Sequence, residues 1–279
     1  MNEQFFIFNK EYYPSGTPVV TPANRSLRYG DGLFETMRME QGKIVNSDFH
    51  FERLFAAMKW LQMDIPGFFS KDYFFHSVNG LLSRNSIHQN ARIRLMFFRG
   101  EEGIFEIKNN SINFIIETFP LAGDFKLNEE GLAVDLFTDA AKSCDRFSNL
   151  KSNNYLPSVM AARFSRKNNL DEAILLNAFG RICESSISNV FIIKEKKLYT
   201  PPLSEGCVAG TMRRWMLEKL KMDLYVVHQK ALTIEDLLAA EEFFLTNAIQ
   251  PVRWVRQFRD KTYGNRRVKE IFTYFTERK

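Results

Sequence analysis

Two hydrophobic periodicities alternate along the chain. Short runs that are rich in β-branched and aromatic residues, and that end at polar or turn residues, are typical of strands. We predict eight such strands, at Phe5–Phe8, Ala91–Phe98, Ile112–Glu117, Ala133–Phe137, Ala173–Leu176, Val190–Ile193, Tyr225–His228 and Glu242–Leu245. Between them, apolar residues recur at helical spacing, which predicts a mixed α/β (α+β) fold.

The predicted helices are recognised by their apolar stripes and their end signals. Ser47 and Asp48 are expected to cap a helix that runs to about Leu61. Thr233-Ile-Glu-Asp236 is a variant of the capping box and predicts another helix start. The other predicted helices are Ser70–Leu82, Asn153–Arg166, Thr211–Lys221 and a terminal helix from Arg266.

The segment Phe119-Pro-Leu-Ala-Gly-Asp124 separates two sets of strands and carries turn residues. It predicts a small N-terminal domain over residues 1–120, a linker over 121–127 and a larger C-terminal domain over 128–279. A cleft between two such domains is a common place for a ligand.

Composition places the chain among ordinary globular proteins. Its 279 residues are 45% hydrophobic and 25% charged, and the 27 phenylalanines indicate an aromatic-rich core or pocket. The N-terminus has no basic segment followed by a long apolar run, and no stretch approaches the ~20 apolar residues of a membrane span. Cys144, Cys183 and Cys207 lie far apart with no metal-binding spacing. We therefore expect a cytoplasmic protein with neither disulfides nor a bound metal.

The net charge of +5 and the pI near 9.0 favour an anionic ligand. A small anionic molecule fits better than a nucleic acid, because no nucleic-acid motif and no long basic run is present.

Lys151 and Glu184 are the first candidates for chemistry. Lys151 lies among small polar residues between a strand set and a helix start, and a lysine held in a cleft can attack a carbonyl as a nucleophile. Glu184 precedes small hydroxyl residues and a buried strand, so its carboxylate could hold a protonated ring nitrogen. The alternatives are a solvated surface lysine and a carboxylate that caps a turn.

Several weaker signals point to an anion. The loop Gly206–Arg213 leads into a helix whose first N–H groups, together with Thr211, could bind a phosphate. Arg53 could clamp a phosphate or form a surface salt bridge, and Thr246 and Asn247 could donate to one or form a turn. Pyridoxal phosphate is held by a lysine, by an acid that faces its ring nitrogen and by a site that binds its phosphate.

In this combination the chain resembles the class IV aminotransferase family, the fold-type IV pyridoxal phosphate enzymes, from about Tyr29 to Val255. The segments that carry the resemblance are Tyr29-Gly-Asp-Gly-Leu-Phe-Glu-Thr36, His50-Phe-Glu-Arg-Leu54, Lys151-Ser-Asn-Asn154, Gly180 with Glu184 and Ser188-Asn189, Thr200-Pro-Pro-Leu203, Ala209-Gly-Thr-Met-Arg213 and Leu245-Thr-Asn-Ala248. It implies the two-domain fold of D-amino acid aminotransferases, with a small N-terminal α/β domain and a larger, barrel-like C-terminal β domain with helices.

The resemblance also implies roles for single residues. Lys151 matches the lysine that forms the Schiff base with pyridoxal 5'-phosphate, and Glu184 matches the partner of the pyridine nitrogen. The positions that match residues around the phosphate are Arg53, Thr211, Met212, Thr246 and Asn247. The family usually has threonine where Met212 stands, so a hydroxyl contact is absent there while backbone donation survives.

Within the family, Gly30-Asp-Gly-Leu-Phe-Glu-Thr36 and the Lys-x-x-Asn-Tyr spacing look most like the 4-amino-4-deoxychorismate lyases. The implied reaction eliminates pyruvate from 4-amino-4-deoxychorismate to give 4-aminobenzoate in folate biosynthesis, with Lys151 as the general base. The candidate substrate-binding residues are Phe34, Thr36, Arg92, Arg94 and Arg99.

Two other functions remain open from the sequence. One is a transaminase that uses the same cofactor on D-amino or branched-chain amino acids, and the other is a mildly basic binding protein without catalysis. The resemblance further implies a homodimer in which a loop of the partner subunit closes each site.

Overall fold

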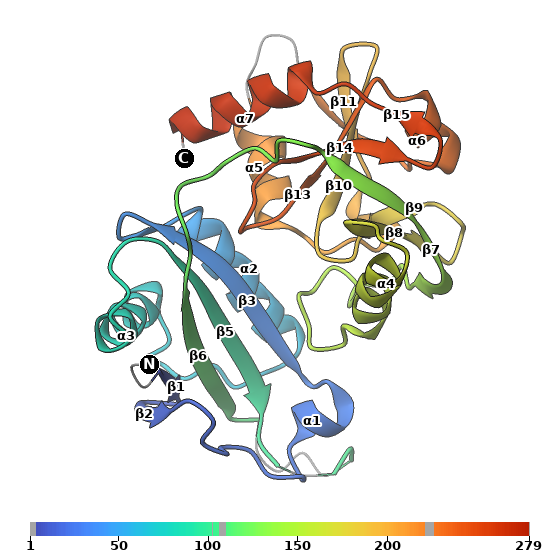
Figure 1. Cartoon of the computed structure of the whole chain (residues 1–279). Helices are drawn as coiled ribbons and strands as arrows, with labels where there is room; N and C mark the ends of the chain where they lie inside the picture. The colour runs from blue at the N-terminus through green and yellow to red at the C-terminus, as the bar shows by residue number, and fades with distance from the viewer. Residues whose placement is uncertain (1–3, 102, 106–109, 221–225, 279) are drawn as a thin grey trace. The chain divides into compact units, whose positions relative to one another are not determined.

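The computed structural model describes residues 4–101, 103–105, 110–220 and 226–278, and the chain divides into two compact units (Figure 1). The first unit comprises residues 1–124 and 151–154, and the second comprises residues 125–150 and 155–279. Residues 151–154 thus belong to the first unit although both neighbouring segments belong to the second. Each unit is described by itself below.

The first unit is built on an antiparallel sheet. Among the described residues it has six strands in the order β2-β1-β6-β5-β3-β4. The strands are β1 (Phe5–Phe8), β2 (Glu11–Pro14), β3 (Gly32–Glu40), β4 (Lys43–Ile44), β5 (Ala91–Arg99) and β6 (Ile112–Pro120). The helices are α1 (Arg25–Tyr29), α2 (Ser47–Trp60) and α3 (Lys71–Arg84).

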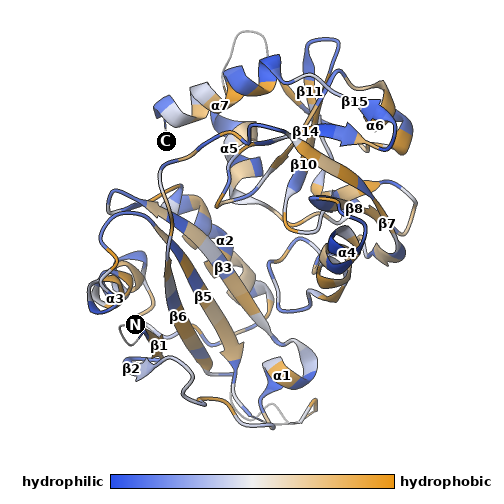
Figure 2. Ribbon diagram, viewed as in Figure 1, coloured by the Kyte–Doolittle hydropathy of each residue, from blue (hydrophilic) through white to orange (hydrophobic). Residues whose placement is uncertain are grey.

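One face of this sheet is buried and holds the aromatic core that the phenylalanine content predicted. In β5 the buried positions alternate with Arg92 and Arg94, which are exposed. Helix α2 packs on β3, and α3 packs on β6 and β1. Between them, Phe74 is fully buried, and its ring centroid lies 5.0 Å from that of Phe69 and 5.4 Å from that of Phe97. Figure 2 shows the hydrophobic stretches of these strands interrupted by hydrophilic residues.

The starts of the two long helices differ in how they are capped. Ser70, the first residue of the predicted helix, is its N-cap and accepts a hydrogen bond from the N–H of Tyr73. The predicted capping by Ser47 and Asp48 is wrong, because Asn46 occupies the cap position in the left-handed conformation and makes no side-chain cap bond. Asp48 instead pairs with Lys71.

The second unit is built on a larger mixed sheet. Among the described residues it has nine strands, eight of them in the order β12-β11-β10-β13-β14-β7-β8-β9, with β15 paired to β14. The strands are β7 (Leu132–Lys142), β8 (Glu172–Asn177), β9 (Ile182–Ser185), β10 (Asn189–Lys194), β11 (Lys197–Thr200), β12 (Val227–Gln229), β13 (Glu242–Thr246), β14 (Arg253–Phe258) and β15 (Lys261–Thr262). A short turn joins β9 at the end of this order to β10 near its other end, so the sheet curls.

Helices cover parts of this curled sheet, with α4 against β7 and β8 and α7 against β13. The helical segments are α4 (Leu156–Lys167), the 3-10 turn η1 (Leu203–Glu205), α5 (Thr211–Lys219), α6 (Ile234–Ala239) and α7 (Arg266–Arg278). The capping box of Thr233 and Asp236 is present as predicted. Helix α4, however, begins at Leu156 rather than Asn153, because the preceding residues pair with β3.

All eight predicted strands overlap an observed strand, although Tyr225 lies outside the described residues. The three cysteines are free. No helix in the described part of the chain has both the length and the apolar character needed to cross a membrane.

Candidate active site

In the first unit, the lysine segment is bound to the beginning of β3. The N–H of Phe34 donates to the carbonyl of Lys151 at 2.9 Å, and the N–H of Asn153 donates to the carbonyl of Gly32 at 3.0 Å. Lys151 is thereby fixed by strand-like pairing rather than by a helix. Its Nζ atom lies 4.4 Å from the centroid of the Phe34 ring.

The glycine at position 32 makes this close approach possible. A Cβ atom there would lie 2.5 Å from Nδ2 of Asn153 and 2.7 Å from the backbone oxygen of Phe97. Asn153 could move its side chain, but the Phe97 oxygen belongs to the backbone of β5, so glycine is the residue that fits between β5 and the lysine segment at this point. The second glycine of the Gly-Asp-Gly segment is therefore required for steric reasons.

Phe34 and two other candidate residues share one face of the sheet. Thr36 is opposite Arg94 in the register of β3 and β5, and Phe34 is opposite Met96. The Arg94 guanidinium carbon lies 5.2 Å from the centroid of the Phe34 ring, so this ring meets both Arg94 and Lys151. Arg92 follows the same face and lies over the ring of Phe119 at 4.4 Å.

Arg99 lies on the buried face instead, because it is an odd number of residues away from Arg94. It is paired with Asp31, and it also donates to the side chain of Asn110 and the carbonyl of Leu61. The alternation of β5 distinguishes it from Arg92 and Arg94. Its guanidinium serves the fold of the first unit.

Arg53 is held by a buried carboxylate on the same side as Arg99. Its Nε and Nη2 atoms donate to the two oxygens of Glu35 at 2.8 Å and 2.6 Å. His50 Nδ1 lies 2.7 Å from Glu35 Oε2. The sequence suggested a clamp or a surface salt bridge within α2 for Arg53, whereas this pair connects α2 to β3 and is largely buried.

Charges around Glu35 set the protonation of this cluster. Burial raises the pKa of Glu35, but the charges of Arg53 and His50 outweigh that effect and lower it to about 2. Burial lowers the pKa of His50, with Arg53 and Lys151 lowering it further against the opposite effect of Glu35. Lys151 is therefore within electrostatic reach of this cluster.

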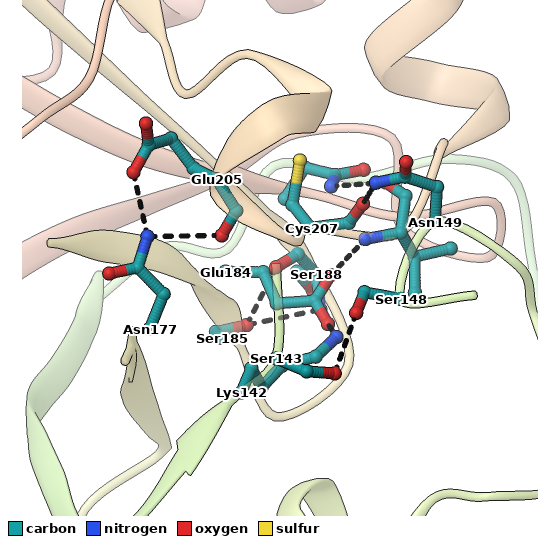
Figure 3. A network of polar contacts seen from close by, with 12 residues as sticks. Lys142, Ser143, Ser148, Asn149, Asn177, Glu184, Ser185, Ser188, Glu205 and Cys207 are labelled. Carbon is teal, nitrogen blue, oxygen red and sulfur yellow. Dashed lines mark hydrogen bonds and ion pairs between the residues drawn. The ribbon is translucent and has the colours of Figure 1, made fainter. Parts of the chain in front are cut away.

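In the second unit, Glu184 lies in β9 and is almost completely buried. Its Oε2 atom accepts the backbone N–H of Val208 at 2.9 Å, and its Oε1 atom pairs with Lys142 (Figure 3). The carboxylate thus connects the end of β7 with the loop before α5. Capping of a turn, the alternative from the sequence, is not what this side chain does.

The loop before α5 is braced by two asparagines. Asn149 Nδ2 donates to the carbonyls of Leu203 and Cys207 at 2.8 Å and 2.7 Å, and Asn189 Nδ2 donates to that of Val208 at 2.9 Å. A Cβ atom on Gly210 would collide with Asn189 Oδ1. Helix α5 begins at Thr211, as predicted, and both Thr211 and Met212 are buried.

Thr246 is the last residue of β13, and Asn247 directly follows it. Asn247 Oδ1 accepts the N–H groups of Ile249 and Gln250, which is the Asx-type turn that the sequence left open. Its Nδ2 atom donates to Ser188 Oγ at 3.1 Å. The hydroxyl of Thr246 is buried and is one of three buried side-chain polar atoms in the described part of the chain that have no hydrogen-bond partner.

The second unit fits the phosphorylated ring that the resemblance implies. An unpartnered buried hydroxyl is costly and is commonly satisfied by a ligand. The loop before α5 leads into first-turn N–H groups with no side chain at Gly210, and Glu184 supplies a buried acid. These features match an anion and a ring nitrogen.

Two residues of this site were not singled out from the sequence. Tyr155 has its pKa raised to about 12 by burial and by the charge of Glu184, so it lies close to that carboxylate. Its place after Lys151-Ser-Asn-Asn was the available signal. Nothing in the sequence indicated that Lys142 belongs to this site, because it is 42 residues from Glu184 and only the sheet brings the two together.

Comparison with known proteins defines the class. The model of the amino-transferase class IV family matches residues 32–258, so the chain belongs to that family. It is 30% identical to "Aminodeoxychorismate lyase" of Bacillus subtilis over 263 residues, which cover 92% of this chain and 87% of that protein. It is 27% identical to "Branched-chain-amino-acid aminotransferase" of Pseudomonas aeruginosa over 250 residues, which cover 86% and 80%.

A solved structure confirms the predicted fold. The branched-chain amino acid aminotransferase from Escherichia coli superposes on this chain with a TM-score of 0.86 at 23% identity, covering 99% of this chain and 94% of that one. At 23% identity the match supports the fold alone.

Proposed function

We propose that the protein is a pyridoxal 5'-phosphate-dependent 4-amino-4-deoxychorismate lyase that releases pyruvate and forms 4-aminobenzoate. The observation that carries the proposal is the sheet face on which Lys151 and Arg94 meet the ring of Phe34, with Thr36 beside them. A lysine nucleophile beside a fixed cation suits an amino substrate that carries carboxylates. Support also comes from the 30% identity to the Bacillus subtilis lyase.

The cofactor would be held by the residues that the resemblance names. Glu184 would face the pyridine nitrogen, while the phosphate would be bound by Thr246, the N–H groups of Thr211 and Met212, and Arg53. When bound, the cofactor supplies a carbonyl carbon for an amine and a conjugated ring that accepts negative charge.

The chain's own residues would act on protons and position. The amine of Lys151, once displaced by the substrate, accepts the proton of the substrate Cα as a general base. Arg94 and Arg92, both exposed on the Phe34 face, bind a substrate carboxylate. Arg99 is already engaged by Asp31, so it supports the sheet rather than the substrate.

Aminotransferase activity is the second candidate, and the 27% identity to the Pseudomonas aeruginosa enzyme favours it. The same lysine and arginines would serve there. The difference is chemical: a lyase completes its cycle with one substrate and leaves the cofactor unchanged, whereas an aminotransferase requires an acceptor keto acid to complete its cycle.

The test is a coupled assay of pyruvate released from 4-amino-4-deoxychorismate without any keto acid. We expect steady release by the wild type and a loss of at least about a thousandfold in Lys151→Ala, because the base and the covalent link to the cofactor are removed. Lys167→Ala is the matched control, since Lys167 is exposed at the end of α4.

Two results would contradict the proposal. If D- or L-amino acids react only when a keto acid is added, and 4-amino-4-deoxychorismate releases no pyruvate, the protein is an aminotransferase. If the purified protein is colourless and Lys151→Ala has the same absorption spectrum as the wild type, the cofactor assignment itself is wrong.

A further inference from the structure

The ion pair of Lys142 and Glu184 is a feature that the proposed reaction does not use. Lys142 is the last residue of β7, and Glu184 lies in β9, with β8 between these two strands. The side chains are 13% and 5% exposed, so both charges are mostly withdrawn from water. Such a pair is destabilising unless each charge is well compensated.

An irregularity in the sheet brings the lysine to this position. The parallel register of β7 and β8 runs from Val134 to Phe137, shifts, and resumes where Lys142 meets Asn177. Glu184 is opposite Leu175 on the other side of β8. Because the long side chain of Lys142 spans the intervening strand, its ammonium reaches Oε1 while the N–H of Val208 holds Oε2.

The groups around Lys142 leave Glu184 as its charged partner. Burial raises the pKa of Cys183, and it raises those of Cys207 and Tyr155 to about 12, so these three groups are neutral near pH 7. Burial lowers the pKa of Lys142, but the Glu184 carboxylate more than offsets this and raises it. Lys142 is thus held as an ammonium, which cannot act as a nucleophile.

We propose that Lys142 is a positioning residue that fixes the Glu184 carboxylate in one orientation and, by its charge, sets how strongly the bound cofactor retains its ring proton. The inference rests on the proposed placement of the pyridine nitrogen at Glu184.

The direction of the effect follows from charge. With Lys142 present, the ring nitrogen faces a pair whose charges largely cancel. Without it, the ring nitrogen faces an uncompensated carboxylate in a medium of low polarity, and a protonated cofactor becomes more favourable. Removing the charge of Lys142 should therefore raise the pH at which the ring nitrogen of the bound cofactor loses its proton.

The experiment is a pH titration of the holoenzyme loaded with pyridoxal 5'-phosphate that carries 15N in its ring, with the 15N NMR shift of the ring nitrogen as the readout. The variants are Lys142→Gln, which removes the charge, Lys142→Arg, which keeps it, and Glu184→Gln, which removes its partner. Lys167→Gln is the matched exposed control. We expect the midpoint to rise by about one pH unit in Lys142→Gln, to stay at the wild-type value in Lys142→Arg and Lys167→Gln, and to fall in Glu184→Gln.

A second measurement distinguishes the loss of the Lys142–Glu184 pair from misfolding of a variant. Free energies of unfolding of Lys142→Gln, Glu184→Gln and the double variant form a cycle in which we expect the double variant to be less destabilised than the sum of the single variants. Additive losses, or an unchanged midpoint in Lys142→Gln with cofactor bound, would overturn the role of Lys142. An unchanged midpoint in Glu184→Gln would instead overturn the cofactor placement on which the inference rests.

Discussion

Glu35 holds two side chains of α2 against β3. It accepts two hydrogen bonds from Arg53 and lies within 2.7 Å of His50. Arg53 is a long side chain that would otherwise sample several rotamers, and the paired carboxylate restricts it to one. If Arg53 binds the cofactor phosphate as proposed, Glu35 would hold its guanidinium in one orientation before the phosphate is bound.

The pH dependence of stability follows from this cluster. Because the pKa of Glu35 is lowered to about 2 in the folded protein, its stabilising effect is complete above about pH 4.5 and is lost as the pH falls toward 2. The lowered pKa of His50 adds a loss in the same direction that begins below about pH 6.5.

We expect Glu35→Gln to lower the free energy of unfolding at pH 7 by about 3–5 kcal/mol, since it leaves Arg53 without its buried partner. Its loss of stability between about pH 4.5 and pH 3 should be shallower than that of the wild type. Urea denaturation at several pH values measures both, with the exposed Glu129→Gln as control. If the free energy of unfolding of Glu35→Gln falls as steeply as that of the wild type in this pH range, this role of Glu35 is disproved.

At the residue scale, the sequence identified charged side chains but not their partners. Lys151, Glu184 and Arg53 stand in recognisable segments. Their partners depend on strand register and on helix packing, which no local pattern encodes. Arg99 could have been separated from Arg94 by strand alternation alone, because the two differ by an odd number of positions.

Among the elements, β3 has the central part in the candidate site. Its first residues pair with β5 on one side and with residues 151–153 on the other. Its two faces carry different groups. Phe34 and Thr36 are half-buried on one face, and Glu35 is fully buried on the other.

We expect Gly32→Ala to displace the lysine segment. The added Cβ would lie 2.7 Å from the backbone oxygen of Phe97, which cannot move without disturbing β5. Activity should fall at least tenfold, and stability by about 1–3 kcal/mol. Gly67→Ala is the matched control, because nothing lies within 4 Å of its added Cβ.

The measurements are the pyruvate assay and thermal unfolding. Wild-type activity in Gly32→Ala would mean that Lys151 does not depend on its pairing with β3. A loss of stability without a loss of activity would carry the same meaning.

Elements with strong periodicity were predictable, and elements defined by distant contacts were not. The aromatic strands β5 and β6 and the helix α7 were found because their patterns are long and regular. Residues 153–155 were assigned to a helix, but backbone pairing with β3 gives Asn153 a better partner than a helical turn would. The strands β4 and β15 have two residues each, too few for a pattern. The strands β2, β3, β9, β11 and β14 were not predicted either, although β3 has nine residues.

On the scale of the whole molecule, the exposed face of α4 is a candidate interface for the predicted homodimer. Leu156, Val159 and Met160 are 69%, 49% and 43% exposed and follow each other at helical spacing. Apolar residues gathered in this way are typical of an interface.

We expect a homodimer in solution, with α4 in its interface. Val159→Glu should shift the mass measured by light scattering after gel filtration toward that of a monomer, because a charge would be buried against apolar residues. Leu238→Glu is the control, since Leu238 is similarly exposed on α6. If the wild type has the mass of a single chain, 32.6 kDa, the dimer is excluded.

Because residues 151–154 belong to the first unit, the polypeptide passes from one unit to the other three times, after Asp124, after Leu150 and after Asn154. Cutting the chain once between 124 and 125 would leave Lys151 on the fragment that lacks β3. Two such fragments could regain the backbone pairing of Lys151 with β3 only by reassociating, so the position of this lysine depends on a continuous chain or on two fragments that bind each other.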